Sequence, residues 1–275
     1  MKRVEFDNLS VAYEDEGDGI PIVCIHGYPL NRQIWGPQCE GLASSARVIA
    51  PDLRNHGDSF IRRNSVSHGA IHSMDLLAED LAHMLDAMGV SQPVVINGLS
   101  MGGYVAFAFY RRFPRRARGL ILTATRARPD VDMERENRIK AIQQAQTRGV
   151  ASIVDGMLQR LVSPKTIAER PGLVERIREI MLSNTVEGVV GDLSGMMDRP
   201  DARPLLPEIR VPVLILVGKD DRIVPIEEAQ AMNDLIPDSR LEIIGDAGHL
   251  PNMEQPELYN RIVRDFIQLL ERGQA

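Results

Sequence analysis

The stretch that decides the fold is VVINGLSMGG, residues 94–103. It opens with β-branched apolar residues, which are typical of a strand buried on both faces. A G-x-S-x-G pattern follows, in which Gly98 and Gly102 flank Ser100, and residues 101–113 continue as an expected helix. So sharp a strand-to-helix turn requires small neighbours and exposes the serine hydroxyl. We therefore predict that Ser100 is a nucleophile rather than an ordinary serine in a glycine-rich turn.

Apolar runs alternate with helical patterns on both sides of this stretch. The runs typical of buried parallel strands are residues 22–25, 48–50, 94–96, 119–122 and 213–217. Residues 74–88 repeat apolar side chains at helical spacing and stop before Gly89. Further helices are expected at residues 33–42, 101–113, 227–235 and 256–270, and an antiparallel edge hairpin at residues 4–14. The pattern predicts an α/β protein with a mostly parallel, doubly wound sheet.

The strand pattern disappears between residues 125 and 206. Helix-like stretches at 134–148, 153–161 and 173–182 alternate with prolines there, and strand patterning resumes at Val213. We expect a core domain made of residues 1–124 and 207–275 and a helical cap insertion at 125–206. Open α/β sheets bind ligands at the carboxyl ends of their strands, where such a cap would cover a pocket.

Composition and charge disfavour several classes of protein. The 275 residues are 44% apolar and 25% charged, as in a globular protein, and the net charge of -6 is the wrong sign for gripping nucleic acid. No apolar stretch has the length of a membrane span or an export signal. Cys24 and Cys39 make neither a disulfide framework nor a metal cluster. We expect a cytoplasmic protein without metal, membrane or nucleic-acid partners.

A serine hydroxyl becomes reactive when a histidine removes its proton and a carboxylate fixes the tautomer of that histidine. His249 lies in GDAGHLP, residues 245–251, directly after the last strand pattern, so it can reach the carboxyl edge of the sheet. We therefore predict that His249 is the base. Other histidines are expected to be structural: solvated or capping for His68, His72 and His83, and bracing its own turn for His56.

The partner carboxylate is expected at the end of the preceding strand, in VGKDDRIVP, residues 217–225. Asp220 and Asp221 compete for the role, because only one of two adjacent turn residues can point inward; we choose Asp221. The chain order Ser100, Asp221, His249 is that of the α/β hydrolases.

Attack on a carbonyl places negative charge on its oxygen, which preorganised backbone N–H groups stabilise. Met101 follows the nucleophile at a helix N-terminus and supplies one N–H. The loop HGYP, residues 26–29, supplies the N–H of Tyr28 as the second, since Pro29 has none.

Together these motifs resemble the α/β-hydrolase fold superfamily. The resemblance is carried by IHGYP at residues 25–29, Trp35, PDLRNHGDS at residues 51–59, the Ser100 turn, residues 218–225 and residues 248–249. The chain is similar to the small-cap esterases and lactonases grouped around 3-oxoadipate enol-lactonase. This resemblance implies the triad Ser100, Asp221 and His249, an oxyanion hole from Tyr28 and Met101, and no cofactor. Asn55 stands where a glycine is common in this family. Asparagine tolerates a left-handed backbone conformation, so we expect the turn to be kept.

We expect the substrate to be a small-molecule ester or lactone, cleaved through an acyl-enzyme. Candidate substrate contacts are Trp35, Tyr104, Arg126 and Leu250, and Arg126 or Arg128 could bind a carboxylate. Each of these side chains could instead simply pack or face solvent. Carbon–carbon bond hydrolases, perhydrolases and small-molecule receptors can keep the same triad, so they stay open as alternatives. Oligomeric state is not predicted.

Overall fold

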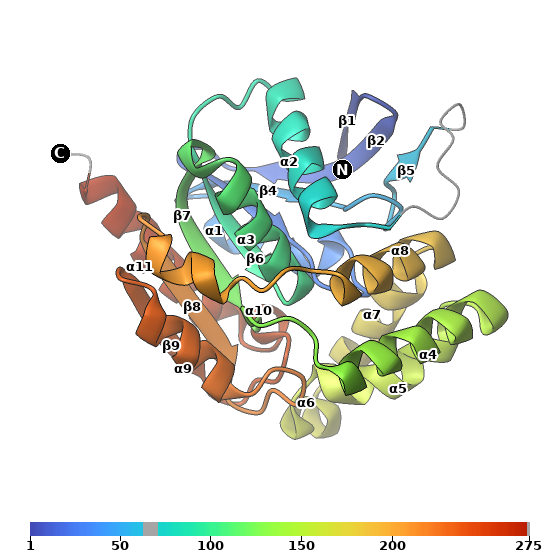
Figure 1. Cartoon of the computed structure of the whole chain (residues 1–275). Helices are drawn as coiled ribbons and strands as arrows, with labels where there is room; N and C mark the ends of the chain where they lie inside the picture. The colour runs from blue at the N-terminus through green and yellow to red at the C-terminus, as the bar shows by residue number, and fades with distance from the viewer. Residues whose placement is uncertain (63–70, 274–275) are drawn as a thin grey trace.

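The computed structural model describes residues 1–62 and 71–273, which build a sheet flanked by helices (Figure 1). Within these residues the strand order is β1-β2-β4-β3-β6-β7-β8-β9, and β5 pairs with β2. The strands are β1 (Lys2–Phe6), β2 (Leu9–Glu16), β3 (Pro21–Ile25), β4 (Arg47–Pro51), β5 (Phe60–Ile61), β6 (Val94–Leu99), β7 (Ala117–Thr123), β8 (Val213–Gly218) and β9 (Ser239–Ile244). The predicted doubly wound sheet is confirmed.

Strands β3, β4 and β6 to β9 are parallel, while β1 and β2 form the expected antiparallel hairpin. Leu99 at the end of β6 pairs with Thr123, and Thr123 pairs with Leu216 near the end of β8. The carboxyl ends of these strands therefore meet along one edge. The residues that follow β3, β6, β8 and β9 are consequently brought together there.

Helices cover both faces of this sheet. The helices are α1 (Gly36–Leu42), α2 (Met74–Ala87), α3 (Met101–Arg112), α9 (Ile226–Leu235), α10 (Pro251–Glu254) and α11 (Pro256–Arg272), with 3-10 turns η1 (Arg32–Trp35), η2 (Pro114–Arg116) and η3 (Arg203–Glu208). Because α1 leads from β3 to β4 and α3 leads from β6 to β7 in the opposite direction, right-handed connections place them on opposite faces. The predicted helix at 33–42 is split, with a 3-10 turn before α1.

Between β7 and β8 the chain forms five helices, which Figure 1 shows grouped on one side of the sheet. They are α4 (Asp132–Arg148), α5 (Ala151–Leu161), α6 (Pro164–Glu169), α7 (Pro171–Leu182) and α8 (Val186–Met197), and we call them the insertion. Helices α6 and α8 were not predicted from the sequence. Helix α8 contains three glycines, which lower intrinsic helix propensity, so its stability depends on packing.

The glycines of α8 lie where that helix touches the core. A Cβ on Gly191 would lie 2.6 Å from the His72 ring, and one on Gly195 would lie 1.7 Å from the His72 carbonyl oxygen. A Cβ on Gly188 would lie 2.3 Å from the carbonyl oxygen of Asn55. The glycines therefore permit a backbone approach that any side chain would prevent.

Next to Gly191, Asp192 is fully buried between two histidines. Its Oδ1 forms a hydrogen bond with Nδ1 of His72 at 2.9 Å. Its Oδ2 lies 3.0 Å from Nε2 of His56, but the angles of this second contact are outside good hydrogen-bond geometry. The other nitrogen of His56 lies 3.0 Å from the Arg54 carbonyl. An acceptor thus faces each nitrogen of His56, which favours the protonated form of this imidazole.

Two histidines are placed differently from the prediction. His72 is buried rather than solvated, because Asp192, 120 residues away in sequence, lies against its ring. His56 braces its own turn, as predicted, but also lies against the same aspartate of the insertion. His83 is exposed beside Asp7, as predicted. His68 lies outside the described residues.

Charge at this contact links stability to pH. Burial alone would lower the pKa of His56, but the Asp192 carboxylate outweighs it and raises that pKa above 6.5. Burial would likewise raise the pKa of Asp192, and the charge of His56 instead holds it below its usual range. Stability from a raised histidine pKa is fully present below pH 6.5 and is lost as pH rises through the folded-state pKa.

We therefore expect Asp192→Asn to lower the free energy of unfolding by about 3 kcal/mol at pH 6, because the buried His56 cation loses its partner. The deficit relative to wild type should shrink as pH rises to 9, once His56 is neutral in both proteins. Urea unfolding of both proteins from pH 6 to 9 measures this difference. A deficit independent of pH would show that His56 carries no charge at this contact.

Candidate functional site

Ser100 occupies the turn between β6 and α3 with φ of 54° and ψ of -112°, a left-handed conformation that is costly for a residue with a side chain. Its N–H donates to the Thr123 carbonyl at 2.8 Å, and its own carbonyl accepts from the Thr125 hydroxyl at 2.7 Å. Its neighbours in β6 are buried, whereas Ser100 is partly exposed. The turn thus presents the serine at the carboxyl edge of the sheet.

Glycines allow the backbones around Ser100 to approach closely. A Cβ on Gly98 would lie 2.2 Å from the Gly102 carbonyl oxygen, and one on Gly102 would lie 2.3 Å from the Ile25 carbonyl oxygen. A Cβ on Gly27 would lie 3.1 Å from the Cβ of Ser100. The loop after β3 is therefore packed directly against the serine turn.

His249 and Asp221 meet at the same edge. Nδ1 of His249 lies 2.8 Å from Oδ2 of Asp221, and both side chains are buried. Oδ1 of Asp221 accepts the N–H groups of Ile223 at 2.7 Å and Val224 at 3.0 Å, which fixes the carboxylate. Asp220 is exposed, and its side chain makes none of the hydrogen bonds found in the described residues. This geometry favours Asp221 over Asp220 as the partner of the imidazole.

The second nitrogen of this imidazole, Nε2, is buried and has no hydrogen-bond partner in the described part of the chain, Ser100 included. Since Nδ1 donates to a carboxylate, Nε2 carries a free lone pair. The insertion holds the histidine loop: the His249 N–H donates to the Leu161 carbonyl at 2.9 Å. The carboxylate of Glu254 accepts the N–H groups of Gly248 at 2.8 Å and Ser163 at 2.7 Å.

The loop after β3 carries the predicted oxyanion donor. The carbonyl of Gly27, in the same peptide as the Tyr28 N–H, accepts from His26 Nδ1 at 3.0 Å and from the Leu30 N–H at 2.9 Å. Nε2 of His26 accepts the Leu53 N–H at 3.0 Å, so Nδ1 holds the proton. Burial and the nearby His56 lower the pKa of His26 to about 3. A neutral histidine therefore orients this peptide, a role that was not predicted from the sequence.

The other predicted donor is Met101, the first residue of α3. N–H groups in the first turn of a helix have no partner within the helix and carry its positive dipole end. Gly27 places the Tyr28 loop beside the same serine turn. Both predicted N–H groups therefore belong to backbone segments that touch at Ser100.

A cavity of about 490 Å³ lies between the insertion and this edge. The core contributes Tyr28, from the oxyanion loop, and Ile223, whose N–H holds Asp221, and helices α4, α5 and α8 supply most of the remaining wall. The Tyr28 hydroxyl is buried without a hydrogen-bond partner in the described residues. Burial raises its pKa, so the group stays a protonated donor. Ser100, Met101 and His249 do not line this cavity, but Tyr28 and Ile223 connect it to the loops that carry the predicted oxyanion donor and Asp221, so it is the candidate substrate site.

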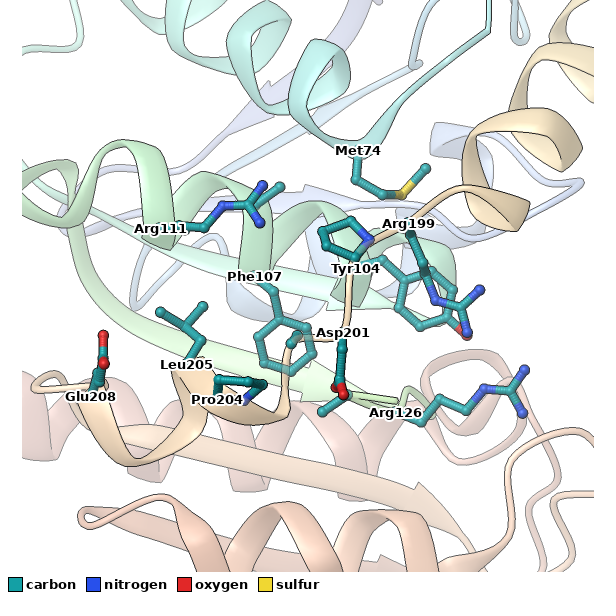
Figure 2. Close-up of a pocket in the computed structure, with 14 residues that line it drawn as sticks. Met74, Tyr104, Phe107, Arg111, Arg126, Arg199, Asp201, Pro204, Leu205 and Glu208 are labelled. Atoms are coloured by element: carbon teal, nitrogen blue, oxygen red, sulfur yellow. The ribbon is translucent and has the colours of Figure 1, made fainter. Parts of the chain in front are cut away.

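A second cavity, of about 240 Å³, lies between α3, the start of α2 and residues 199–208 (Figure 2). Tyr104 lines this cavity rather than the one beneath the insertion, and the Arg199 guanidinium lies 4.2 Å from the centre of its ring. Arg126 borders both cavities, and in Figure 2 its guanidinium points away from Phe107. Neither the Tyr28 loop nor the Asp221 loop lines this second cavity.

Two other predicted substrate contacts lie in the core. Trp35 is fully buried, its ring lies 6.3 Å from that of Tyr259, and it lines neither cavity. Leu250 is fully buried beside His249 and also lines neither cavity. For both residues this placement favours the packing role that the sequence left open, because closeness in sequence does not fix the direction of a side chain.

The two arginines that follow β7 are engaged in ion pairs rather than free. Arg126 bonds to Glu134 at 2.7 Å and Asp130 at 3.3 Å, whereas Arg128 bonds to Glu134 at 2.8 Å and Glu228 at 2.6 Å. Burial would raise the pKa of Glu134, but hydrogen bonds from Arg128 and the charge of Arg126 hold it at about 2. Arg126 is buried, so of the alternatives that the sequence left open for this residue, facing solvent is wrong.

The residues described by the structure contain no group of three side chains suited to binding a metal ion. Among the same residues, no helix combines the length and apolar character that crossing a membrane requires. Cys24 and Cys39 are both buried and free.

Comparison with solved structures supports the fold described above. An esterase from Thermogutta terrifontis, solved with malate bound, matches with a TM-score of 0.93 and 41% sequence identity, covering 98% of this chain and 99% of that one.

Among related sequences, a Bacillus subtilis protein provisionally named 2-succinyl-6-hydroxy-2,4-cyclohexadiene-1-carboxylate synthase is 31% identical, over 95% of this chain and 96% of its own. The 2-hydroxy-6-oxo-2,4-heptadienoate hydrolase of Pseudomonas putida is 30% identical, over 92% and 91%. The 3-oxoadipate enol-lactonase 2 of Acinetobacter baylyi is 26% identical, over 93% and 91%. Residues 20–256 match the family described as the alpha/beta hydrolase fold. The chain therefore belongs to the α/β-hydrolase fold family and resembles its enol-lactonases.

Proposed function

We propose that this chain is a serine hydrolase that cleaves small carboxylic esters or lactones through an acyl-enzyme. The observation that carries the proposal is the buried pair of His249 and Asp221, which leaves Nε2 of the imidazole unpartnered at the sheet edge where Ser100 is partly exposed. A base with a fixed tautomer and a free nitrogen is what a serine hydroxyl requires. The similarity to an esterase at 41% identity supports the same chemistry.

In the proposed reaction, Nε2 of His249 takes the hydroxyl proton as the Ser100 oxygen bonds to the carbonyl carbon. The carbonyl oxygen becomes an oxyanion, which the N–H groups of Tyr28 and Met101 stabilise, while Asp221 stabilises the imidazolium. The imidazolium then protonates the departing alcohol oxygen, leaving the acyl-serine. Water, deprotonated by His249, attacks this ester and returns the free serine and the carboxylic acid. The cycle uses only groups of the chain and water.

We further propose that the insertion acts as the cap of this site and that the cap comprises residues 125–206. Its helices supply most of the wall of the larger cavity, and Leu161 holds the histidine loop. We retain the cytoplasm as the proposed location.

Carbon–carbon bond hydrolysis is the second candidate. The similarity to the Pseudomonas putida 2-hydroxy-6-oxo-2,4-heptadienoate hydrolase favours it, and the same triad could serve both reactions. Turnover of a vinylogous 1,5-diketone compared with p-nitrophenyl butyrate separates the two candidates. Faster turnover of the diketone would replace ester hydrolysis as the main activity.

The charges around the larger cavity suggest that the substrate carries a carboxylate. Arg126, Arg138 and Arg160 line the cavity, but Arg126 is paired with Glu134 and Asp130 and Arg138 is paired with Asp130. Arg160 is exposed and, among the described residues, forms no salt bridge, so its charge is available to a ligand. The malate in the Thermogutta terrifontis esterase is itself a dicarboxylate and supports this choice of substrate class.

Replacing the nucleophile tests the mechanism. We expect Ser100→Ala to lower kcat for p-nitrophenyl acetate by about a million-fold, since no other group can form the acyl-enzyme. The thermal midpoint of this variant should not fall, because alanine removes only the hydroxyl. Activity within a few-fold of wild type would exclude the proposed enzyme and leave a small-molecule receptor as the better assignment.

The choice between two adjacent aspartates can be tested with matched isosteric variants. Asp221→Asn should lower kcat by about ten-thousand-fold, because the amide no longer fixes the histidine tautomer. Asp220→Asn should stay within about three-fold of wild type, since that side chain is exposed and surface changes are usually small. Steady-state kinetics of both variants decide the assignment, and equal losses would contradict it.

Specificity for a carboxylate can be tested at the exposed arginine. Arg160→Ala should raise KM for monomethyl succinate about ten-fold by removing a charged partner, and should leave KM for methyl butyrate unchanged. An equal change in KM for both esters would mean that Arg160 does not bind the carboxylate.

A further inference from the structure

The turn between α7 and α8 touches two core loops through one side chain. Asn184 is 6% exposed, and its Nδ2 donates to the Pro29 carbonyl at 2.9 Å. Its Oδ1 accepts the N–H of Gly57 at 3.0 Å. One amide of the insertion therefore bridges the loop that carries Tyr28 and the loop after β4.

Chemistry fixes the orientation of this amide. The Gly57 N–H can only donate and the Pro29 carbonyl can only accept, so oxygen and nitrogen cannot exchange places. Nδ2 also donates to the carbonyls of Ile180 at 3.1 Å and Met181 at 3.3 Å, which anchors the side chain to the end of α7. A buried amide with all its partners satisfied is a rigid connection.

A second asparagine supports the same connection from the core. Nδ2 of Asn31 donates to the Ser183 hydroxyl at 2.8 Å and lies 3.3 Å from Oδ1 of Asn184. Its own Oδ1 accepts the N–H of Gln33 and caps the turn that follows. The loop is thus held to the insertion at residues 29 and 31, immediately after Tyr28.

We propose that Asn184 is a positioning residue for the oxyanion hole, an inference that rests on the proposed function. On one side of Tyr28, His26 and Leu30 hold the carbonyl of the Gly27–Tyr28 peptide. On the other side, Asn184 holds the carbonyl of Pro29. The Tyr28 N–H is thereby fixed from both directions. Oxyanion donors act only within a few tenths of an ångström of the right place, so this support has a measurable effect on catalysis.

Two substitutions separate positioning from packing. Asn184→Ala removes every bond of the amide, whereas Asn184→Asp is isosteric, keeps an acceptor for Gly57 and sets a carboxylate oxygen against the Pro29 carbonyl. Thr185→Val is the matched control: its hydroxyl binds the Asn55 carbonyl at 2.8 Å and the Gly188 N–H at 3.0 Å but does not reach residues 26–31. The isosteric variant carries the test if the alanine variant does not fold.

Kinetics with p-nitrophenyl acetate and inhibition by a trifluoromethyl ketone, whose serine adduct bears an oxyanion, provide the measurement. Both Asn184 variants should lower kcat about ten- to a hundred-fold with KM within about three-fold, and should raise the inhibition constant by a similar factor. Thr185→Val should change kcat and the inhibition constant by less than about three-fold.

Two results would overturn the inference: kcat of both Asn184 variants within about three-fold of wild type, or an unchanged inhibition constant. A loss in the control as large as in the Asn184 variants would show that general loosening of the insertion, and not positioning, is the cause. Failure of the proposed function is recognised separately, because wild type itself would then lack Ser100-dependent ester turnover.

Discussion

The structure depends on the close backbone contact between the serine turn and the loop after β3. Ser100 holds a left-handed conformation that costs on the order of 1–3 kcal/mol, and it persists because its surroundings over-determine it. At Gly98 and Gly102, the carbonyl oxygen of another residue lies too close to leave room for a Cβ, and Gly27 lies against the serine side chain. These close approaches bring the loop that carries Tyr28, one of the two proposed N–H donors, against the serine turn.

The insertion is joined to the core by buried polar groups rather than by apolar packing alone. Asp192 lies between His56 and His72, Glu254 binds N–H groups of the histidine loop and the insertion, and Asn184 bridges two core loops. Such groups are costly when they lose a partner, so they favour one arrangement of insertion and core over others. The wall of the larger cavity is therefore fixed relative to the serine turn.

The sheet, most helices and the meeting of Asp221 with His249 were predictable from sequence, because apolar periodicity and strand-end position determine them locally. The partners of Asp192 and Asn184 were not, since each contact joins residues more than 100 positions apart. Helix α8 escaped prediction because its glycines serve tertiary contact and oppose helix propensity. Arg126 and Arg128 looked free in sequence, and only the fold reveals Glu134 between them.

We propose that Ser100 is an activated nucleophile in the wild-type protein. Treatment with a fluorophosphonate, followed by peptide mass spectrometry, tests it most directly, because only a serine with a working base and oxyanion hole reacts rapidly. We expect one adduct per chain, on Ser100, and no adduct after His249→Ala. Absence of an adduct, or an adduct confined to another residue, would contradict it.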